Sequence, residues 1–242
     1  MSAEPGGGEL QAVVERYARR DPQDPRYSLL RPEVRHSVHE RQRATLALLA
    51  RLLRQQPQWP PLQGLRLVEV GCGNGSNLLE LLRYGFAPHN LVGLELLPDL
   101  VQAARAQLPD ALHILQGDAS AAPIEPASQH IVLASTVFSS LLDGAFQQQL
   151  AASMWSWLQP GGGVLWYDFT FDNPRNPDVR GVPLSRVRAL FPQATISSRR
   201  ITLAPPLARV VCRWHPALYP VLNSLPFLRT HQLAWLAKPA RP

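Results

Sequence analysis

Three glycines in the stretch VEVGCGNGSN, residues 68–77, could bring backbone amides close to a bound ligand. Gly71, Gly73 and Gly75 are spaced G-x-G-x-G, between an apolar run of strand length and a helical pattern. The dinucleotide-binding pattern G-x-G-x-x-G requires its third glycine where this chain has Ser76. The loop therefore indicates a nucleotide-type ligand without saying which one.

Acidic residues at three predicted strand ends narrow the choice of ligand. Glu95 is placed to accept hydrogen bonds from two ribose hydroxyls, as in nucleotide cofactors generally. Asp118, in LQGDAS, could accept a hydrogen bond from an adenine amino group, with the Ala119 amide near the ring. Glu69 precedes the glycine loop, where a carboxylate disfavours a pyrophosphate and favours a cation. These acids favour S-adenosylmethionine, which carries a sulfonium and an ammonium group, over NAD.

The elements that must position these residues follow from apolar runs that alternate with amphipathic stretches. Strands are predicted at 65–70, 91–96, 112–116, 131–135, 164–169, 195–203 and 232–237. Helices are predicted between them at 76–84, 99–108, 144–158 and 184–191. The sequence LQPGGG, residues 158–163, is expected to end the third of these helices and to force a turn. The predicted fold class is therefore α/β, with helices on both faces of a seven-stranded, mainly parallel sheet.

Two segments lie outside this alternation. Residues 1–10 are expected to be disordered, and residues 11–60 to form an N-terminal helical lid with helices at 10–19 and 33–55. The main domain is expected over residues 61–242, including an apolar, proline-broken helical insertion at 205–229. Because lids exclude water, the N-terminal helices and the insertion are expected to cover the acceptor site. A dimer contact or ordinary core packing would also explain the insertion.

Composition sets the broad class of protein. A chain of 242 residues that is 45% hydrophobic is expected to form one large domain. Its two cysteines lack C-x-x-C spacing, so neither a disulfide framework nor a structural zinc site is predicted. No signal peptide or transmembrane segment is recognisable, and a soluble, cytoplasmic protein is expected. The net charge is +6, but the arginines look scattered, so nucleic-acid binding is not favoured.

The motifs taken together resemble a known family. VEVGCGNGS, GLEL, GDAS, ASTVFSSL and LQPGGGVLWYDF, in this order, resemble class I S-adenosylmethionine-dependent methyltransferases of the type 11/12 kind over about residues 60–170. The resemblance implies a sheet of order 3-2-1-4-5-7-6 with an antiparallel seventh strand, S-adenosylmethionine as donor and S-adenosylhomocysteine as product. It places the glycines at the methionine moiety and the Ser135 backbone at its amino group. The complete predicted cofactor site is Glu69, Gly71, Cys72, Gly73, Asn74, Gly75, Glu95, Leu96, Asp118, Ala119 and Ser135.

The acceptor is expected beyond the carboxyl ends of the strands, beside the loop YDFTFDNPRNPDVRG. Asp168 or Asp172 is predicted to be the base that deprotonates it, and Asn173, Arg175 and Arg180 to contact it. The alternative is that these side chains only cap turns of the loop.

Histidines and metal ions provide further alternatives. His36, His39, His215 and His231 could each act as the base, although surface or capping roles are more common for histidine. Some small-molecule O-methyltransferases of the resembled class hold Mg²⁺ with an Asp-Asn pair, which Asp172 and Asn173 resemble. Ser135 and Thr136 stand where a further carboxylate ligand would be needed, so no metal is predicted.

The predicted function is methyl transfer to a small-molecule acceptor, in the first place a hydroxyl of a sugar, glycan or secondary metabolite. WYDF, DNPRNP and LPFLRTH together resemble bacterial methyltransferases of glycan or secondary-metabolite biosynthesis. The alternatives are N-methylation of a small amine, methylation of nucleic acid or protein, and a non-catalytic cofactor-binding module. The aromatic motif with which many enzymes methylate nucleobase amino groups is absent after the fourth strand, which reads STVF. The apolar insertion also allows a homodimer.

Overall fold

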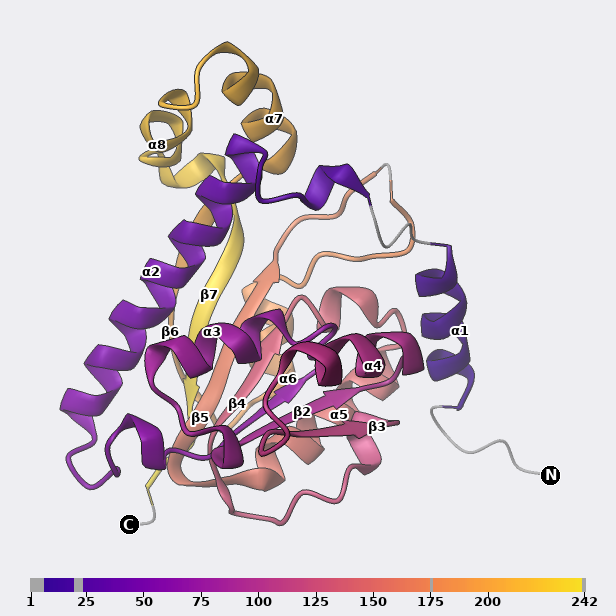
Figure 1. The fold of residues 1–242 in the computed structure, drawn as a ribbon, viewed down its shortest axis with the longest axis vertical. Coiled ribbons are helices and arrows are strands. Elements are labelled where there is room, and N and C mark those ends of the chain that lie inside the picture. The colour runs from indigo at the N-terminus through magenta and orange to yellow at the C-terminus, as the bar shows by residue number, and fades with distance from the viewer. Residues whose placement is uncertain (1–6, 20–23, 175, 241–242) are drawn as a thin grey trace.

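The structure is a computed structural model that describes residues 7–19, 24–174 and 176–240. Its centre is one sheet of order β3-β2-β1-β4-β5-β7-β6, in which β1 to β5 are parallel and β7 runs antiparallel to both of its neighbours (Figure 1). This confirms the predicted fold class and strand order. The strands are β1 (Leu67–Val70), β2 (Leu91–Glu95), β3 (His113–Gln116), β4 (Gln129–Ser135), β5 (Leu158–Phe169), β6 (Thr195–Leu203) and β7 (Arg229–Ala237).

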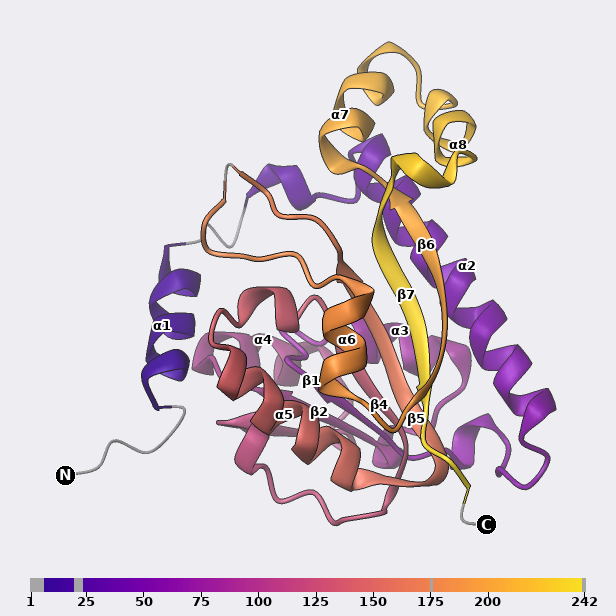
Figure 2. The same ribbon diagram turned by 180° about the vertical axis from the view of Figure 1, so that it is seen from behind.

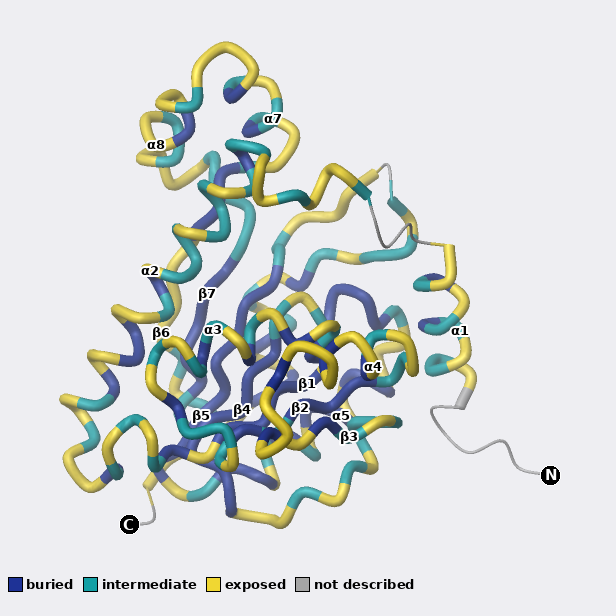
Figure 3. The backbone as a smooth tube through the Cα atoms, in the orientation of Figure 1, coloured by how far each residue is buried: buried dark blue, intermediate teal, exposed yellow. Residues whose placement is uncertain are grey.

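Helices cover both faces of the sheet (Figures 1 and 2). On one face α2 (Pro32–Gln55), α3 (Ser76–Tyr84) and α4 (Pro98–Gln107) pack on side chains such as Leu67 and Leu165. On the other face lie α1 (Gly7–Ala18), α5 (Gly144–Trp157) and α6 (Leu184–Leu190). Successive side chains of a strand point to opposite faces, so each strand contributes to both cores. The inner strands β1, β2, β4 and β5 are accordingly buried along most of their length, whereas the edge strands β3 and β6 are partly exposed (Figure 3).

The segment LQPGGG differs from the prediction. It belongs to β5, which begins at Leu158, and does not form a turn that separates helix from strand. Leu158 pairs with Gln129 and Gly163 with Ile131, so residues 159–162 are inserted into the ladder as a bulge. Gly161 supplies the φ of +79° that the bulge needs. Glycine therefore lets the chain kink within the sheet instead of leaving it.

The two ends of the chain also show where sequence patterns fell short. Helix α1 begins at Gly7, so residues 7–10 are helical and not disordered, while residues 1–6 lie outside the described part. The insertion is helical as expected, with α7 (Pro205–Trp214), α8 (Leu218–Asn223) and the short 3-10 turn η6 (Pro226–Leu228). It projects from one end of the molecule, beside the start of α2 (Figures 1 and 2). None of the helices described is both long and apolar enough to cross a membrane.

Candidate active site

A cavity of about 350 Å³ opens at the carboxyl ends of β1, β2 and β4. This volume suits a small organic ligand. Leu10, Val13 and Tyr17 of α1 close one side of it. The predicted cofactor residues that line it are Gly71, Cys72, Gly73, Asn74, Glu95, Leu96, Asp118, Ala119 and Ser135. We call this space the donor cavity.

The glycine loop reaches the cavity because its backbone adopts conformations that disfavour side chains. Gly71, Gly73 and Gly75 have φ of +62°, +57° and +85°. A Cβ on Gly73 would have nothing within 4 Å, so this glycine faces open space. A Cβ on Gly75 would lie 2.6 Å from Leu108 Cδ1, so Gly75 does not line the cavity. Its role is to let the start of α3 pack closely on α4.

Backbone amides hold Glu95 in place. Gly73 N donates to Glu95 Oε2 at 2.8 Å and Leu97 N donates to Oε1 at 2.9 Å. Each carboxylate oxygen can accept one further hydrogen bond. Asp118 is fixed in a similar way, because Ser120 N and Ser120 Oγ donate to its two oxygens. Both carboxylates are therefore preset in the wall of the donor cavity.

Glu69 lies behind this wall and does not line the cavity. Its side chain is fully buried, Asn77 Nδ2 donates to Oε1 at 2.6 Å, and Oε2 has no hydrogen-bond partner. Burial raises the pKa of Glu69 to about 8, while the Asn77 hydrogen bond and the charge of Arg41 oppose the shift. Burial also raises the pKa of the neighbouring Cys72 thiol, so Cys72 is not an activated nucleophile.

The charges around the donor cavity fit S-adenosylmethionine better than a dinucleotide. Glu95 and Asp118 line the cavity, Glu69 lies behind it, and among the described residues Arg41 is the one basic side chain in the lining. A pyrophosphate would face the carboxylates of Glu95 and Asp118 with little compensation, whereas a sulfonium and an ammonium group would be stabilised. The unpartnered Oε2 of Glu69 also favours a cation nearby.

Arg41 is the principal site residue that the sequence reading missed. It lies midway along α2, where Nη1 is 3.5 Å from Ser135 Oγ and Cζ lies 5.3 Å from the centre of the Tyr167 ring. No carboxylate of the described residues lies within 4.0 Å of its guanidinium. A signal was present in the sequence, because Arg41 shares the buried face of α2 with Ala44 and Leu48. A charged residue on a core-facing stripe requires a polar partner or a ligand.

The neighbours of Arg41 tie it to the sheet and to the insertion. The Tyr167 hydroxyl hydrogen-bonds with Thr202 Oγ1 at 2.9 Å. Glu40, the residue before Arg41, accepts hydrogen bonds at Oε2 from Thr202 N (3.1 Å) and from the Tyr219 hydroxyl (3.3 Å). The helix that carries Arg41 is therefore anchored to β6 and α8 at that same turn.

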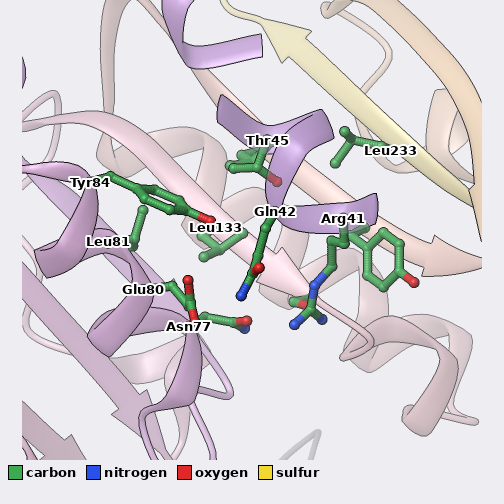
Figure 4. A pocket seen from close by; sticks show the side chains of 12 residues that line it. Arg41, Gln42, Thr45, Asn77, Glu80, Leu81, Tyr84, Leu133 and Leu233 are labelled. Carbon is green, nitrogen blue, oxygen red and sulfur yellow. The ribbon is translucent and has the colours of Figure 1, made fainter. Parts of the chain in front are cut away.

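A second, smaller space of about 40 Å³ adjoins the donor cavity under α2 (Figure 4). We call it the α2 chamber. Figure 4 shows Arg41, Gln42, Asn77 and Glu80 reaching toward one another from α2 and α3. Burial raises the pKa of both Tyr84 and Tyr167 to about 12, so these tyrosines stay protonated at neutral pH. Arg41, Asn77 and Ser135 line both spaces. The α2 chamber is lined by Arg41, Gln42, Thr45, Asn77, Glu80, Leu81, Tyr84, Leu133, Ser135, Leu165, Tyr167 and Leu233.

Asp168, predicted as a base, lines neither space. It is 1% exposed and accepts hydrogen bonds from Ser139 N (3.0 Å) and Phe169 N (2.9 Å), and burial raises its pKa to about 6. The reason lies in strand alternation, because Tyr167 faces α2 and the next residue, Asp168, therefore faces away from it. As the structure stands, Asp168 is a structural carboxylate that positions residues 138–140.

The loop residues after β5 that were predicted to act on the acceptor also line neither space. Asp172, Asn173 and Arg180 are exposed and line neither, and Arg175 lies outside the described residues. Asp172 accepts a hydrogen bond from Gly181 N at 2.8 Å, which is the capping role considered as the alternative. Asp178 forms an ion pair with Arg19 at 2.7 Å. The polar residues of this loop therefore shape the loop itself.

Two of the histidines considered as bases are stacked on tyrosine rings. His231 is stacked on Tyr167, and burial lowers its pKa to about 4. His36 is stacked on Tyr219 with ring centres 4.9 Å apart. The described residues contain no cluster of three His, Cys, Asp or Glu side chains that could hold a metal ion. The insertion at 205–229 lines neither space, although it was expected to cover the acceptor.

Comparison with known proteins agrees with this geometry. Residues 67–162 match the model of a methyltransferase domain family. The chain is 29% identical over 200 residues to trans-aconitate 2-methyltransferase from Afipia carboxidovorans, with 76% of this chain and 71% of the relative covered. A methyltransferase from Thermotoga maritima, described as a possible histamine N-methyltransferase, shares the fold with a TM-score of 0.61 at 14% identity, covering 93% of this chain and 98% of its own.

A further solved structure with the same fold contains the methyl donor. Phosphoethanolamine N-methyltransferase 2 from Haemonchus contortus, in complex with S-adenosylmethionine, has a TM-score of 0.54 at 14% identity, covering 79% of this chain and 53% of its own. The methyltransferase-domain match and the relatives show that this chain is an S-adenosylmethionine-dependent methyltransferase. The names of these relatives refer to different acceptors, so the acceptor has to be inferred from the site.

Proposed function

We propose that this methyltransferase transfers the methyl group to a carboxylate of a small-molecule acceptor, whose reacting end occupies the α2 chamber. The observation that carries the proposal is Arg41, which lies where the donor cavity and the α2 chamber meet. Its guanidinium has no carboxylate of the described residues within 4.0 Å. An arginine in this state is suited to a charge-assisted hydrogen bond with a ligand carboxylate.

Among the described residues no histidine or lysine lines either space, which also supports a carboxylate acceptor. S-adenosylmethionine supplies a methyl group activated by the adjacent sulfonium. A carboxylate is already ionised at neutral pH, so it needs no base, whereas an alcohol does. Arg41 would hold one carboxylate oxygen and leave the other free to attack. The chain would then contribute mainly alignment and the exclusion of water.

One relative supports the same substrate class. The protein from Afipia carboxidovorans is named for trans-aconitate, which is a carboxylate. The α2 chamber also contains Glu80, which would repel a second carboxylate placed beside it. We therefore infer an acceptor that presents a carboxylate to Arg41 and a hydroxyl, amine or apolar group to Glu80.

A hydroxyl acceptor is the second candidate, and it covers sugars, glycans and secondary metabolites. The observation that favours it is again Glu80, because a carboxylate in the chamber could accept the hydroxyl proton. Glu80 Oε1 lies 3.7 Å from Arg83 Nη1, and its side chain is 27% exposed. An amine acceptor would use the same carboxylate to take up the proton that its ammonium group must lose before the nitrogen can attack.

The test is a screen for S-adenosylhomocysteine formation with trans-aconitate, other small carboxylic acids, sugars and amines. A methylated product is then treated with mild alkali, which releases methanol from a methyl ester but not from a methyl ether or a methylamine. A carboxylate acceptor gives an alkali-labile product. An alkali-stable product would overturn the carboxylate proposal and support the hydroxyl or amine reading.

The role of Arg41 needs its own test, because the carboxylate of the donor itself could also bind there. Arg41→Ala is compared with Arg43→Ala, an exposed arginine of the same helix that lines neither space. The proposal expects a KM for the acceptor raised about tenfold or more in Arg41→Ala, with little change in S-adenosylhomocysteine affinity. Weaker binding of S-adenosylhomocysteine, but not of methylthioadenosine, which lacks the amino-acid part, would assign Arg41 to the donor.

A further inference from the structure

Charge is divided unevenly along this chain. Residues 179–242 contain ten basic residues and no acidic one, whereas residues 1–178 contain fourteen basic and eighteen acidic residues. The strongly basic part comprises α6, β6, α7, α8 and β7. The arginines look scattered along the chain, but the excess of positive charge is therefore concentrated in its C-terminal part. A group of helices and strands without acidic side chains has a positive electrostatic field, because none of its own side chains neutralises its basic residues.

Exposed apolar side chains gather at the end of the molecule formed by the same segment. We call residues 24–31 and 205–229 the apex. There Leu30 is 88% exposed, Trp214 82%, Tyr27 77% and Phe227 72%. Val210 and Trp214 lie four residues apart, on one exposed face of α7. The other exposed apolar side chains of the apex are Leu29, Leu218, Val221 and Leu225.

These side chains are not required by the core of the apex. Its own small core consists of Leu203, Ala208, Cys212 and Tyr219, all buried. The exposed set lies outside that core, on a part that projects from the sheet (Figures 1 and 3). Contiguous exposed apolar surface usually marks a contact with another molecule or with a membrane.

The charges at the apex show which kind of surface it fits. Asp24 forms an ion pair with Arg26 at 2.6 Å and Glu33, at the start of α2, with Arg31 at 2.8 Å, so these two carboxylates are neutralised. Glu40 of α2 also contacts the apex, where its Oε2 accepts a hydrogen bond from the Tyr219 hydroxyl at 3.3 Å. The insertion adds Arg209, Arg213 and Arg229 and no acid. Aromatic and aliphatic side chains that project beside arginines fit the surface of an anionic bilayer. The apolar side chains would enter the boundary of the acyl chains, and the arginines would contact the anionic headgroups.

We propose that the apex docks this methyltransferase onto anionic lipid membranes. A second copy of the chain is a poorer fit, because it would bring two surfaces of net positive charge together. A nucleic acid is also a poorer fit, since Leu29, Leu30, Val210 and Val221 offer it neither charge nor a stacking surface. The inference does not depend on which acceptor the enzyme uses.

The test is sedimentation of the full-length protein with vesicles of phosphatidylcholine alone and of phosphatidylcholine mixed with phosphatidylglycerol. The proposal expects binding to the mixed vesicles that weakens with added salt. The double variants Trp214→Ala/Phe227→Ala and Arg209→Glu/Arg213→Glu should each bind about tenfold or more weakly. Leu46→Ala and Arg54→Glu, exposed positions of α2 outside the apex, are the matched controls and should bind like the wild type.

Three outcomes would overturn the proposal. The first is no sedimentation with either vesicle, and the second is equal binding to both vesicles. The third is a dimer in analytical ultracentrifugation that Trp214→Ala/Phe227→Ala dissociates, which would assign the apex to self-association. Circular dichroism of each variant shows whether it remains folded, which is expected because none of the six substituted positions is buried.

Discussion

Glu69 shows how one buried carboxyl can serve a binding site that it does not touch. With a pKa near 8 it is protonated in the free protein at neutral pH. A cation in the donor cavity would favour its ionised form, so binding of the donor and loss of this proton are linked. In agreement with this linkage, Glu69 Oε2 is buried and has no hydrogen-bond partner among the described residues.

Glu69→Gln should therefore change how stability depends on pH. In the unfolded chain Glu69 ionises near its ordinary pKa of 4.5, whereas in the folded protein it stays protonated up to about pH 8. Between these values the unfolded state binds fewer protons, so the free energy of unfolding falls by about 1.4 kcal/mol per pH unit through this group. Urea unfolding of both proteins between about pH 6 and pH 8 should show the wild type losing stability relative to the variant. Parallel curves would contradict the assignment.

Helix α1, which closes one side of the donor cavity, is held in place by a small number of polar contacts. Arg16 forms an ion pair with Glu9 at 2.6 Å and donates to Ser140 O at 3.0 Å. Glu9 Oε1 also accepts from Leu142 N at 2.7 Å, so this pair joins α1 to the segment before α5. Both side chains are about nine-tenths buried, with exposures of 10% and 8%.

Glu9→Ala should loosen this closure, because it leaves Arg16 buried without its partner. We expect S-adenosylhomocysteine to dissociate about tenfold faster from the variant in stopped-flow experiments. Glu15→Ala is the control, because Glu15 is exposed on α1 and accepts a hydrogen bond from Gln11 of the same helix. Equal dissociation rates in all three proteins would mean that α1 does not retain the product.

The bulge in β5 depends on its glycines. A Cβ on Gly162 would lie 2.8 Å from the carbonyl oxygen of His130 and 3.0 Å from that of Gln159, neither of which can move freely. Gly162→Ala should cost about 1 to 3 kcal/mol of unfolding free energy by this overpacking. Gly8→Ala, whose Cβ meets nothing within 4 Å, should have no such cost. Denaturant unfolding of both variants measures the difference, and an unchanged Gly162→Ala protein would refute the close-contact argument.

Local sequence patterns predicted the parts of this protein that are built from consecutive residues. The glycine loop, Glu95 and Asp118 follow strand ends, and their placement depends only on the strand-loop-helix unit that contains them. Arg41 could not be placed in this way, because its position depends on how α2 crosses the sheet. Asp168 was predicted as a base but lies outside both spaces, because the sequence does not show which face of β5 each residue occupies. The polar loop after it was misleading because turn caps and ligand contacts use the same residue types.

The donor cavity brings together elements that are far apart in the sequence. The donor cavity takes residues from α1, α2, the glycine loop and the ends of β2 and β4. A ligand that binds only this folded arrangement stabilises the entire domain by mass action.

Saturating S-adenosylhomocysteine should therefore raise the melting temperature of the protein. At a concentration of about 100 times Kd, the gain of roughly 2.7 kcal/mol corresponds to a shift of about 5 to 10 °C for a domain of this size. Glu95→Ala, which removes the acceptor for Gly73 N and Leu97 N, should show little shift, and Glu80→Gln should behave like the wild type. A full shift in Glu95→Ala would remove Glu95 from the donor site.

The contacts of Glu40 have a consequence for thermodynamic coupling. One helical turn of α2 carries Arg41 on the side of the reaction and Glu40, which binds Thr202 of β6 and Tyr219 of α8. A displacement of this turn by an acceptor at Arg41 must therefore strain or relax the hydrogen bonds that support the apex. Equilibrium couplings are reciprocal, so a surface that binds the apex would change acceptor affinity by the same factor as the acceptor changes attachment to that surface. The enzyme would then bind its acceptor with one affinity when attached and with another when free.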